Sequence, residues 1–405
     1  MTDDDEGIGP LAGFRVIDVS TVLAGPTAAQ LLGDFGAEVI KVEHPTAGDS
    51  LRNHGESKDG EPLWWKIVGR NKRSVGIYLG EPEGADLLLK LARGADVLIE
   101  SFRPGVLESY GLTMDRLQEA NPSLVVLRVS GFGQSGPYSN RPGFGTLIEA
   151  MSGFAHLTGS PDGPPTLAPF GLADSVAGIA GALAVSMALV HRERSGGVGQ
   201  VIDLSLLEPL MAVLGAQTIT YDQLGIVGKR MGNRSQFTAP RNVYRCSDGK
   251  WVAVAASTAS TARRVLRLVG REDIASAEWF SSALERSRRV EEIDGYVAEW
   301  VARRSRAEVL QAFADCDAAA APVYDVADLV EDTQVREREM VLPVHDPRLG
   351  EVLMPNVLFR LSKTPGRIRF TGRTLGADTR SVLSEELGLS DAELERLGDK
   401  GIIAC

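Results

Sequence analysis

The sequence predicts an α/β fold in which a doubly wound parallel sheet is covered by helices, accompanied by a smaller α+β domain. In the first half, short apolar segments typical of buried strands alternate with amphipathic segments typical of helices. This alternation requires crossover connections between parallel strands. The chain has 405 residues, of which 43% are apolar and 24% charged. That is an ordinary globular composition in a chain long enough for two domains.

The expected elements of the first half follow one another along the chain. A strand at 14–18 leads through a Gly/Pro turn into a helix at 27–35, and an amphipathic helix is expected at 83–92. The other expected elements are strands at 38–42, 74–78, 96–99 and 124–129, with a helix at 114–120 before the last of them.

The middle of the chain predicts a buried helix and then a change of domain. An Ala- and Gly-rich segment after residue 175 predicts a helix to about Arg194, and its small side chains favour close packing. A strand is expected at 200–204. Gly and Arg residues from 224 to 236 indicate a linker. The elements expected after it are a strand at 251–255, helices at 260–269 and 289–303, a strand-like segment at 319–324 and an amphipathic helical segment at 381–397.

The charge balance and the cysteines limit what the protein binds and where it works. With 43 basic and 54 acidic residues, the formal net charge is −11, which disfavours nucleic acid and anionic membranes as partners. Three widely spaced cysteines indicate a reducing compartment. The acidic N-terminus is unlike a signal peptide, and the apolar run at 176–190 would span only about 22 Å as a helix. We therefore expect a soluble, cytoplasmic protein.

A Gly-rich segment at 131–136 matches the G-x-G-x-x-G pattern of dinucleotide-binding proteins. That pattern requires a helix to begin within the motif, so that its N-terminus faces the pyrophosphate. Here Pro137 and the polar residues after it indicate a loop, which makes a nicotinamide or flavin oxidoreductase a minor alternative. The five histidines show no metal-binding spacing, and no G-x-S-x-G elbow is present. No metal site is expected.

Asp174 is the strongest candidate for a chemical role. It lies among small and apolar residues where the long helix begins. An aspartate at such a place is either a helix N-cap or a carboxylate available as a covalent nucleophile. The small neighbours Gly171 and Ala173 leave room for a ligand. Two basic segments at strand ends, 71–74 and 103–105, are either plain surface loops or phosphate-binding groups.

Many short motifs occur in a fixed order along the chain. They are found at 15–18, 24–26, 36–43, 71–74, 96–105, 121–122, 150–153, 163–165, 173–175, 191–192, 199–201 and 238–249. Together they resemble the class III coenzyme A transferases, the CaiB–BaiF family, to which formyl-CoA transferase belongs. The resemblance extends over essentially the whole chain.

The resemblance implies an acyl-CoA:carboxylate CoA-transferase whose catalytic residue is Asp174. Asp174 would attack the acyl-CoA thioester to give an acyl-aspartyl anhydride, and the released thiolate would then form an aspartyl-CoA thioester. The incoming acid would displace CoA through a second anhydride. CoA is thus implied as a substrate, with no permanently bound cofactor. The family's CoA contacts fall on Leu23, Ala24, His44, Ile77, Ser101, Phe102 and Arg103.

The family fold is an interlocked homodimer with a large Rossmann-like domain and a small domain. By resemblance, the large CoA-binding domain uses residues 1–225 and 331–405, and the small domain with its linkers uses 226–330. The implied partners are an acyl-CoA, a small carboxylic acid and a second copy of the chain.

Departures from the family pattern bear on the substrate. Formyl-CoA transferase-like members carry Gln in place of Leu23, Tyr-Glu in place of Phe144 and Gly145, and a Gly-rich run where this chain has only 232–234. These differences argue against a formyl or oxalyl substrate. The family also contains acyl-CoA racemases, whose histidine falls near Phe144, and an aromatic ring cannot shuttle a proton. A 2-methylacyl-CoA racemase or epimerase is therefore the second hypothesis, and a non-catalytic CoA-binding protein is a further alternative.

Overall fold

The computed structural model describes residues 9–404, which form two compact units. Unit 1 consists of the described residues up to Phe154, of Leu167–Ala216, and of the described residues from Glu337 onward. Unit 2 consists of Ala155–Thr166 and Gln217–Arg336. The division predicted by resemblance placed the boundaries at 225/226 and 330/331. The two units instead divide at 216/217 and 336/337, and the short segment Ala155–Thr166 belongs to the smaller unit.

Unit 1 is built on a six-stranded sheet with the strand order β5-β2-β1-β6-β7-β8, in which every pair is parallel. The predicted doubly wound parallel sheet is therefore confirmed. The chain builds outward from β1 to one edge and then returns to the other side of β1 with β6, so the order reverses between β1 and β6. The strands are β1 (Arg15–Asp18), β2 (Glu38–Glu43), β5 (Lys72–Gly76), β6 (Val97–Glu100), β7 (Val125–Ser130) and β8 (Val201–Ser205).

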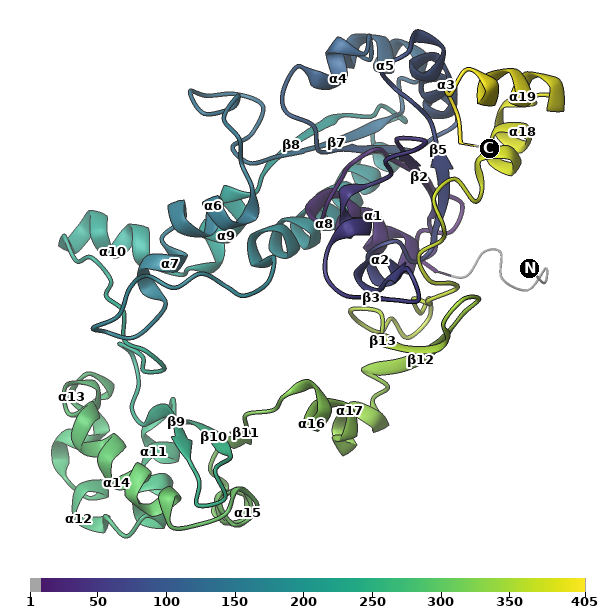
Figure 1. Ribbon diagram of the computed structural model, residues 1–405. Coiled ribbons are helices and arrows are strands. Elements are labelled where there is room, and N and C mark those ends of the chain that lie inside the picture. Colours follow the sequence, from purple (N-terminus) through teal and green to yellow (C-terminus); the bar gives the residue numbers. More distant parts are fainter. Residues whose placement is uncertain (1–8, 405) are drawn as a thin grey trace. The chain divides into compact units, whose positions relative to one another are not determined.

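Helices cover both faces of this sheet, because successive strand residues point to opposite faces. One core contains Ile17 and Leu98 and is closed by α3, α5, α18 and α19; the other contains Val16 and Val97 and is closed by α1, α6, α8 and α9. Figure 1 shows α18 and α19 beside α3. The bounds are α1 (Ala24–Asp34), α3 (Pro82–Arg93), α5 (Met114–Ala120), α6 (Gly145–Met151), α8 (Leu172–Arg194), α9 (Leu207–Val213), α18 (Thr379–Leu387) and α19 (Asp391–Asp399).

The longest described helix, α8, packs closely along α1. A Cβ on Gly178 would lie 2.7 Å from Cβ of Thr27 and 2.9 Å from the carbonyl oxygen of Ala24, so only glycine permits this approach. Among the described residues, α8 is the one helix long and apolar enough to cross a membrane by length and composition. Its contact with α1 is that of a core helix. Its opposite side presents an apolar stripe of Ile179, Leu183, Met187 and Val190.

Unit 2 has its own core beneath a three-stranded antiparallel sheet of order β11-β10-β9. Its strands are β9 (Arg241–Arg245), β10 (Trp251–Ala255) and β11 (Ala320–Pro322). Helices supply Val265, Val297 and Phe313 to this core. They include α11 (Ala259–Leu268), α14 (Val290–Ala302) and α15 (Arg306–Asp315).

The C-terminal segment completes unit 1 at the β5 edge of the sheet. A hairpin of β12 (Val341–Asp346) and β13 (Gly350–Pro355) precedes α18, which packs on β5. Ile403 then forms an antiparallel bridge with Ile77, and the carbonyl oxygen of Ile402 accepts the N–H of Tyr78 at 2.8 Å. Two segments that are more than 300 residues apart in the sequence are thereby hydrogen-bonded to each other beside this edge of the sheet.

Candidate functional site

The reversal of strand order between β1 and β6 creates a crevice at the carboxyl ends of these strands, the usual ligand site of an open parallel sheet. The loops that follow the two strands are tied together there. The backbone N–H of Thr21, after β1, donates to Oγ of Ser101, after β6, at 2.8 Å, and Ser101 Oγ donates to the Thr21 carbonyl oxygen at 3.4 Å. The predicted residue Ser101 thus holds the crevice in shape.

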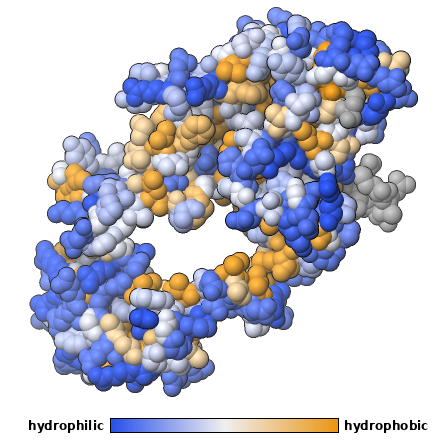
Figure 2. Space-filling model, viewed as in Figure 1, coloured by the Kyte–Doolittle hydropathy of each residue, from blue (hydrophilic) through white to orange (hydrophobic). Residues whose placement is uncertain are grey.

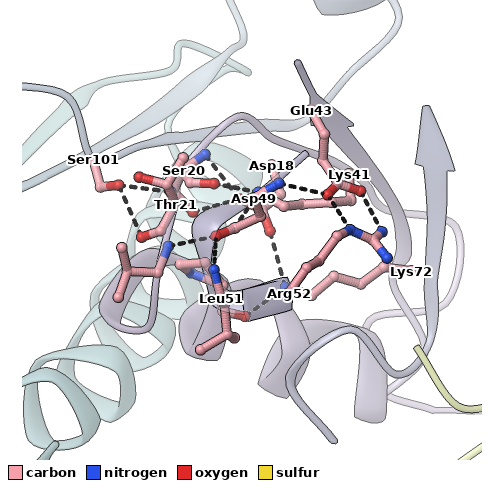
Figure 3. A network of polar contacts seen from close by, with 12 residues as sticks. Asp18, Ser20, Thr21, Lys41, Glu43, Asp49, Leu51, Arg52, Lys72 and Ser101 are labelled. Atoms are coloured by element: carbon pink, nitrogen blue, oxygen red, sulfur yellow. Dashed lines mark hydrogen bonds and ion pairs between the residues drawn. The ribbon is translucent and has the colours of Figure 1, made fainter. Parts of the chain in front are cut away.

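A buried ionic network lies beneath this crevice (Figure 3). Nζ of Lys72 lies 2.9 Å from Oδ2 of Asp18, and Nζ of Lys41 lies 3.7 Å from Oδ1 of Asp18 and 3.3 Å from Oδ2 of Asp49. All four side chains are buried. Burial by itself would raise the pKa of Asp18, but the charges of Lys41 and Lys72 outweigh it and hold the pKa below its ordinary value. Asp18 is therefore a structural anion.

The network fixes the loop between β1 and α1. Oδ1 of Asp49 accepts the backbone N–H groups of Val22 and Leu51, each at 3.0 Å, and Nζ of Lys41 donates to the carbonyl oxygen of Ser20. Val22 has a φ of +67°, a conformation that a β-branched residue adopts at a cost of about 1–3 kcal/mol. Strain of this kind persists only where surrounding contacts enforce it, which marks the loop as a constrained part of the site.

A cavity of about 130 Å³ opens beside this loop. It is lined from the ends of several strands, and the predicted residues His44, Ile77 and Phe102 all border it. The rings of His44 and Tyr78 lie 4.9 Å apart, and those of Phe102 and Tyr110 lie 6.1 Å apart. Aromatic walls around a narrow space suit a flat heteroaromatic ring.

Arg103 directly follows the cavity residue Phe102. Its side chain is exposed, and no acidic partner pairs with it in the part of the chain that the structure describes. A guanidinium in this state is free to bind an anionic group.

Asp174 lies in the first turn of α8. The N-cap of α8 is Gly171, and no side chain caps the helix, so Asp174 is not the N-cap that was one alternative from the sequence. Its carboxylate has neither a hydrogen bond nor an ion-pair partner among residues 9–404. Burial, and secondly the negative charge of Glu149, raise the pKa of Asp174 to about 6. Such a carboxylate is poorly stabilised in its charged form.

Two glycines, Gly145 and Gly171, lie beside the Asp174 carboxylate. A Cβ on Gly145 would lie 2.3 Å from Oδ2 of Asp174, and a Cβ on Gly171 would lie 2.5 Å from Cδ2 of Leu23. The predicted residue Leu23 therefore contacts the start of α8, while Val19 and Thr21 of the same loop border the cavity. Ala24, which begins α1, is buried and lies against α8. One loop thus connects Asp174 with the cavity.

The Gly-rich segment at 131–136 is not a dinucleotide fingerprint. No helix begins within it, and the next helix, α6, starts at Gly145. A Cβ on Gly131 would lie 2.6 Å from Cα of Gly143, so the glycine allows two loop segments to pack directly together. This contact positions the segment that ends at Gly145, the residue beside Asp174. The observation removes the basis for an oxidoreductase.

Unit 2 contains a separate, larger cavity of about 560 Å³. The segment 232–234, noted in the sequence, lines it together with Thr158 and Asn242. Arg234 is held there by Asp294, whose Oδ2 lies 2.8 Å from its Nε. No cluster of three or more His, Cys, Asp or Glu side chains that could hold a metal occurs among the described residues.

Comparison with known proteins decides the family. A model of CoA-transferase family III matches residues 11–379. The chain belongs to CoA-transferase family III. The family predicted from the sequence motifs is thereby confirmed, and the chain is a CoA-transferase.

Relatives of this CoA-transferase cover nearly its whole length. The succinyl-CoA–L-malate CoA-transferase beta subunit of Chloroflexus aurantiacus is 42% identical over 97% of this chain and 98% of its own. The succinyl-CoA–D-citramalate CoA-transferase of the same organism is 38% identical over 97% and 98%. The crystal structure of a CAIB/BAIF family protein from Brucella suis matches with a TM-score of 0.83 and 31% identity, covering 94% of this chain and 100% of the other. These relatives support transfer of CoA between an acyl-CoA and a carboxylate and do not favour a racemase.

Neither the burial of the ionic network nor the place of Glu149 beside Asp174 was predicted from the sequence of this CoA-transferase. Lys41 and Lys72 look like ordinary polar positions of strands with one solvated face, and only the parallel, doubly covered sheet buries them. Glu149 is 2% exposed and lies four residues after Gly145. In the sequence Glu149 is a single acidic residue within a segment expected to be helical, and such a residue most often faces solvent.

Proposed function

We propose that this CoA-transferase works through covalent catalysis on Asp174. An Oδ of Asp174 attacks the thioester carbonyl carbon, the C–S bond breaks, and CoA leaves as the thiolate. The thiolate then attacks Cγ of Asp174 and releases the donor acid, leaving an aspartyl-CoA thioester. The acceptor carboxylate attacks this thioester to give a second anhydride, and the thiolate finally takes the acceptor acyl group and frees Asp174.

The observation that supports this role is the open, unpartnered carboxylate of Asp174. A buried structural aspartate is normally held by backbone N–H groups or by a cation. Asp18 of β1, for example, is held by two lysines. Asp174 has no such partner within the described chain and is only partly buried, and glycine at position 145 leaves free the space beside Oδ2 that a Cβ would fill. Its pKa of about 6 leaves it ionised at neutral pH and more basic than an ordinary carboxylate.

The aromatic cavity and Arg103 together suit CoA. We infer that the adenine ring enters the cavity bordered by His44, Ile77 and Phe102, and that Arg103 pairs with a phosphate group. Leu23 and Ala24 then lie along the path from the cavity to Asp174, where the thioester must arrive. CoA is a substrate in this scheme.

The relatives suggest the acyl groups. Two of them are named for succinyl-CoA as donor and for L-malate or D-citramalate as acceptor. We propose succinyl-CoA as the donor here and a short hydroxylated dicarboxylic acid as the acceptor. The free thiols of Cys246 and Cys316 fit the cytoplasmic location expected from the sequence, which cell fractionation would test.

The decisive experiment is mass spectrometry of the enzyme after incubation with succinyl-CoA in the absence of an acceptor. A CoA adduct on the peptide that contains Asp174, removed when L-malate is added, is the expected result. Asp174→Asn serves as the control and should form no adduct. An adduct on another residue, or turnover that persists in Asp174→Asn, would overturn the proposed mechanism.

We further propose that the enzyme is a homodimer and that a second copy covers the apolar stripe on α8. The stripe residues Ile179, Leu183, Met187 and Val190 are 46–62% exposed, and Figure 2 shows apolar side chains gathered over α6, α8 and α9. Patches of this kind mark interfaces on soluble proteins. Light scattering should give twice the chain mass, and Leu183→Glu should reduce it. A monomeric wild-type protein would contradict the proposal, as would assembly only with a different, related subunit.

A further inference from the structure

Glu149 lies on the face of α6 that meets the start of α8. It is one helical turn after Gly145, the residue that lies against Oδ2 of Asp174, and residues four apart share one face of a helix. Oε2 of Glu149 accepts the backbone N–H of Ala168 at 3.0 Å. Glu149 is thereby held in place by the segment that leads into α8, and the site contains two carboxyl groups on packed helices.

No cation accompanies these two carboxyl groups. Neither Glu149 nor Asp174 forms an ion pair within the described chain, and the charged side chains on the surrounding elements have other partners. Those groups are Asp34 of α1 with Arg70, Arg128 of β7 with Glu100 and Glu108, Asp203 of β8 with the N–H of Gln134, and Glu208 of α9 with Ser205. The charge that acts on Asp174 is therefore that of Glu149, and it is repulsive.

We propose that Glu149 is a positioning residue that promotes acyl transfer by repelling the negative charge of Asp174. The proposal rests on the covalent role of Asp174 proposed above. When Asp174 attacks the thioester, its oxygen forms a C–O bond, the C–S bond breaks, and the negative charge moves to the sulfur of CoA. The anhydride is neutral at Asp174, so acylation removes the repulsion. Glu149 destabilises the reactant carboxylate relative to the acylated form.

The matched variant is Glu149→Gln, which removes the charge but keeps an oxygen that can accept the N–H of Ala168. The quantity to measure is the pH dependence of the first half-reaction, the formation of the Asp174–CoA adduct from succinyl-CoA. In the wild type the acidic limb should have its midpoint near pH 6. In Glu149→Gln we expect this midpoint to fall by up to about one pH unit, with a several-fold lower plateau rate because the carboxylate is less basic.

Two further variants make the test independent of folding and of net charge. Glu149→Asp keeps the charge but withdraws it by one methylene, so its midpoint should lie between those of the wild type and Glu149→Gln. Glu119→Gln removes one exposed charge on α5 and should behave as the wild type.

The outcomes separate the possible roles of Glu149. A lower rate with an unchanged midpoint in both Glu149 variants would show that Glu149 only supports the fold, and would overturn the proposal. If Glu149→Gln does not fold, the midpoint of Glu149→Asp decides the matter by itself. Failure of the wild type to form any adduct on Asp174 would instead overturn the proposed function, so the two failures are distinguishable.

Discussion

The carboxylate of Asp174 lies directly against Gly145, where a Cβ would stand 2.3 Å from Oδ2 and 3.1 Å from Cγ. These separations are well inside van der Waals contact, so no other residue fits at position 145 without moving the carboxylate. The glycine determines how much space an acyl group has when it is attached to Asp174.

Gly145→Ala should therefore reduce turnover strongly while leaving the fold intact. The new methyl group forces the Asp174 carboxylate out of its present orientation, and misplacement by about 1 Å costs on the order of a hundredfold in rate. The measurement is kcat with succinyl-CoA, together with thermal unfolding. Gly295→Ala on α14 is the control, because the added Cβ meets no atom within 4 Å apart from the backbone of its own helix and its two chain neighbours. Wild-type kcat in Gly145→Ala would mean that the acyl group lies elsewhere.

Asp174→Asn should abolish transfer and stabilise the protein at neutral pH. The folded carboxyl has a pKa of about 6 against 3.8 in the unfolded chain, so the folded state binds more protons between these values. The charged form costs the fold up to about 3 kcal/mol above pH 6. The wild type should become more stable as pH falls through 6, and the advantage of Asp174→Asn should vanish near pH 4. Denaturant unfolding at both pH values checks this; a pH-independent difference would contradict the raised pKa.

Arg103→Ala should raise the KM for acyl-CoA and leave the KM for the acceptor acid nearly unchanged. The exposed guanidinium follows the cavity residue Phe102, and loss of a charge-assisted hydrogen bond to phosphate costs about 1.5–3 kcal/mol, or roughly 10- to 150-fold in affinity. Arg93→Ala removes a comparable exposed arginine from α3 and should be neutral. Equal increases in both KM values would indicate a structural role for Arg103.

The enzyme should not racemise a chiral 2-methylacyl-CoA. Racemisation needs two proton-transfer groups on opposite faces of the α-carbon, and Phe144, which precedes α6 and is 63% exposed, offers no proton. Incubation in D₂O followed by mass spectrometry should find the α-hydrogen retained. Deuterium uptake at a rate comparable with CoA transfer would favour the racemase hypothesis instead.

The strands of the parallel sheet could be predicted from the sequence because they depend on local patterns. The apolar runs at 14–18 and 124–129 have the length and the β-branched side chains that are typical of buried strands. Asp174 was singled out by its small neighbours and by the family resemblance, and its catalytic role stays a prediction. Gly145 and Glu149 could not be found this way, because their meaning depends on how α6 packs on α8. Lys41 and Lys72 were missed for the same reason, since burial is a property of the assembled sheet.

The way the C-terminal segment completes the sheet has a consequence for protein synthesis. Ile77 borders the cavity proposed for CoA, and its backbone is paired with Ile403. Residues 402–404 are made more than 300 residues after Ile77, so the growing chain lacks this partner while the intervening segment is synthesised. A chain that stops short of Ile402 would lack both the bridge to Ile77 and the hydrogen bond to Tyr78, so the side of the cavity that these two residues line would lose its support. The cavity proposed for CoA is therefore completed only after residues 402–404 have been made.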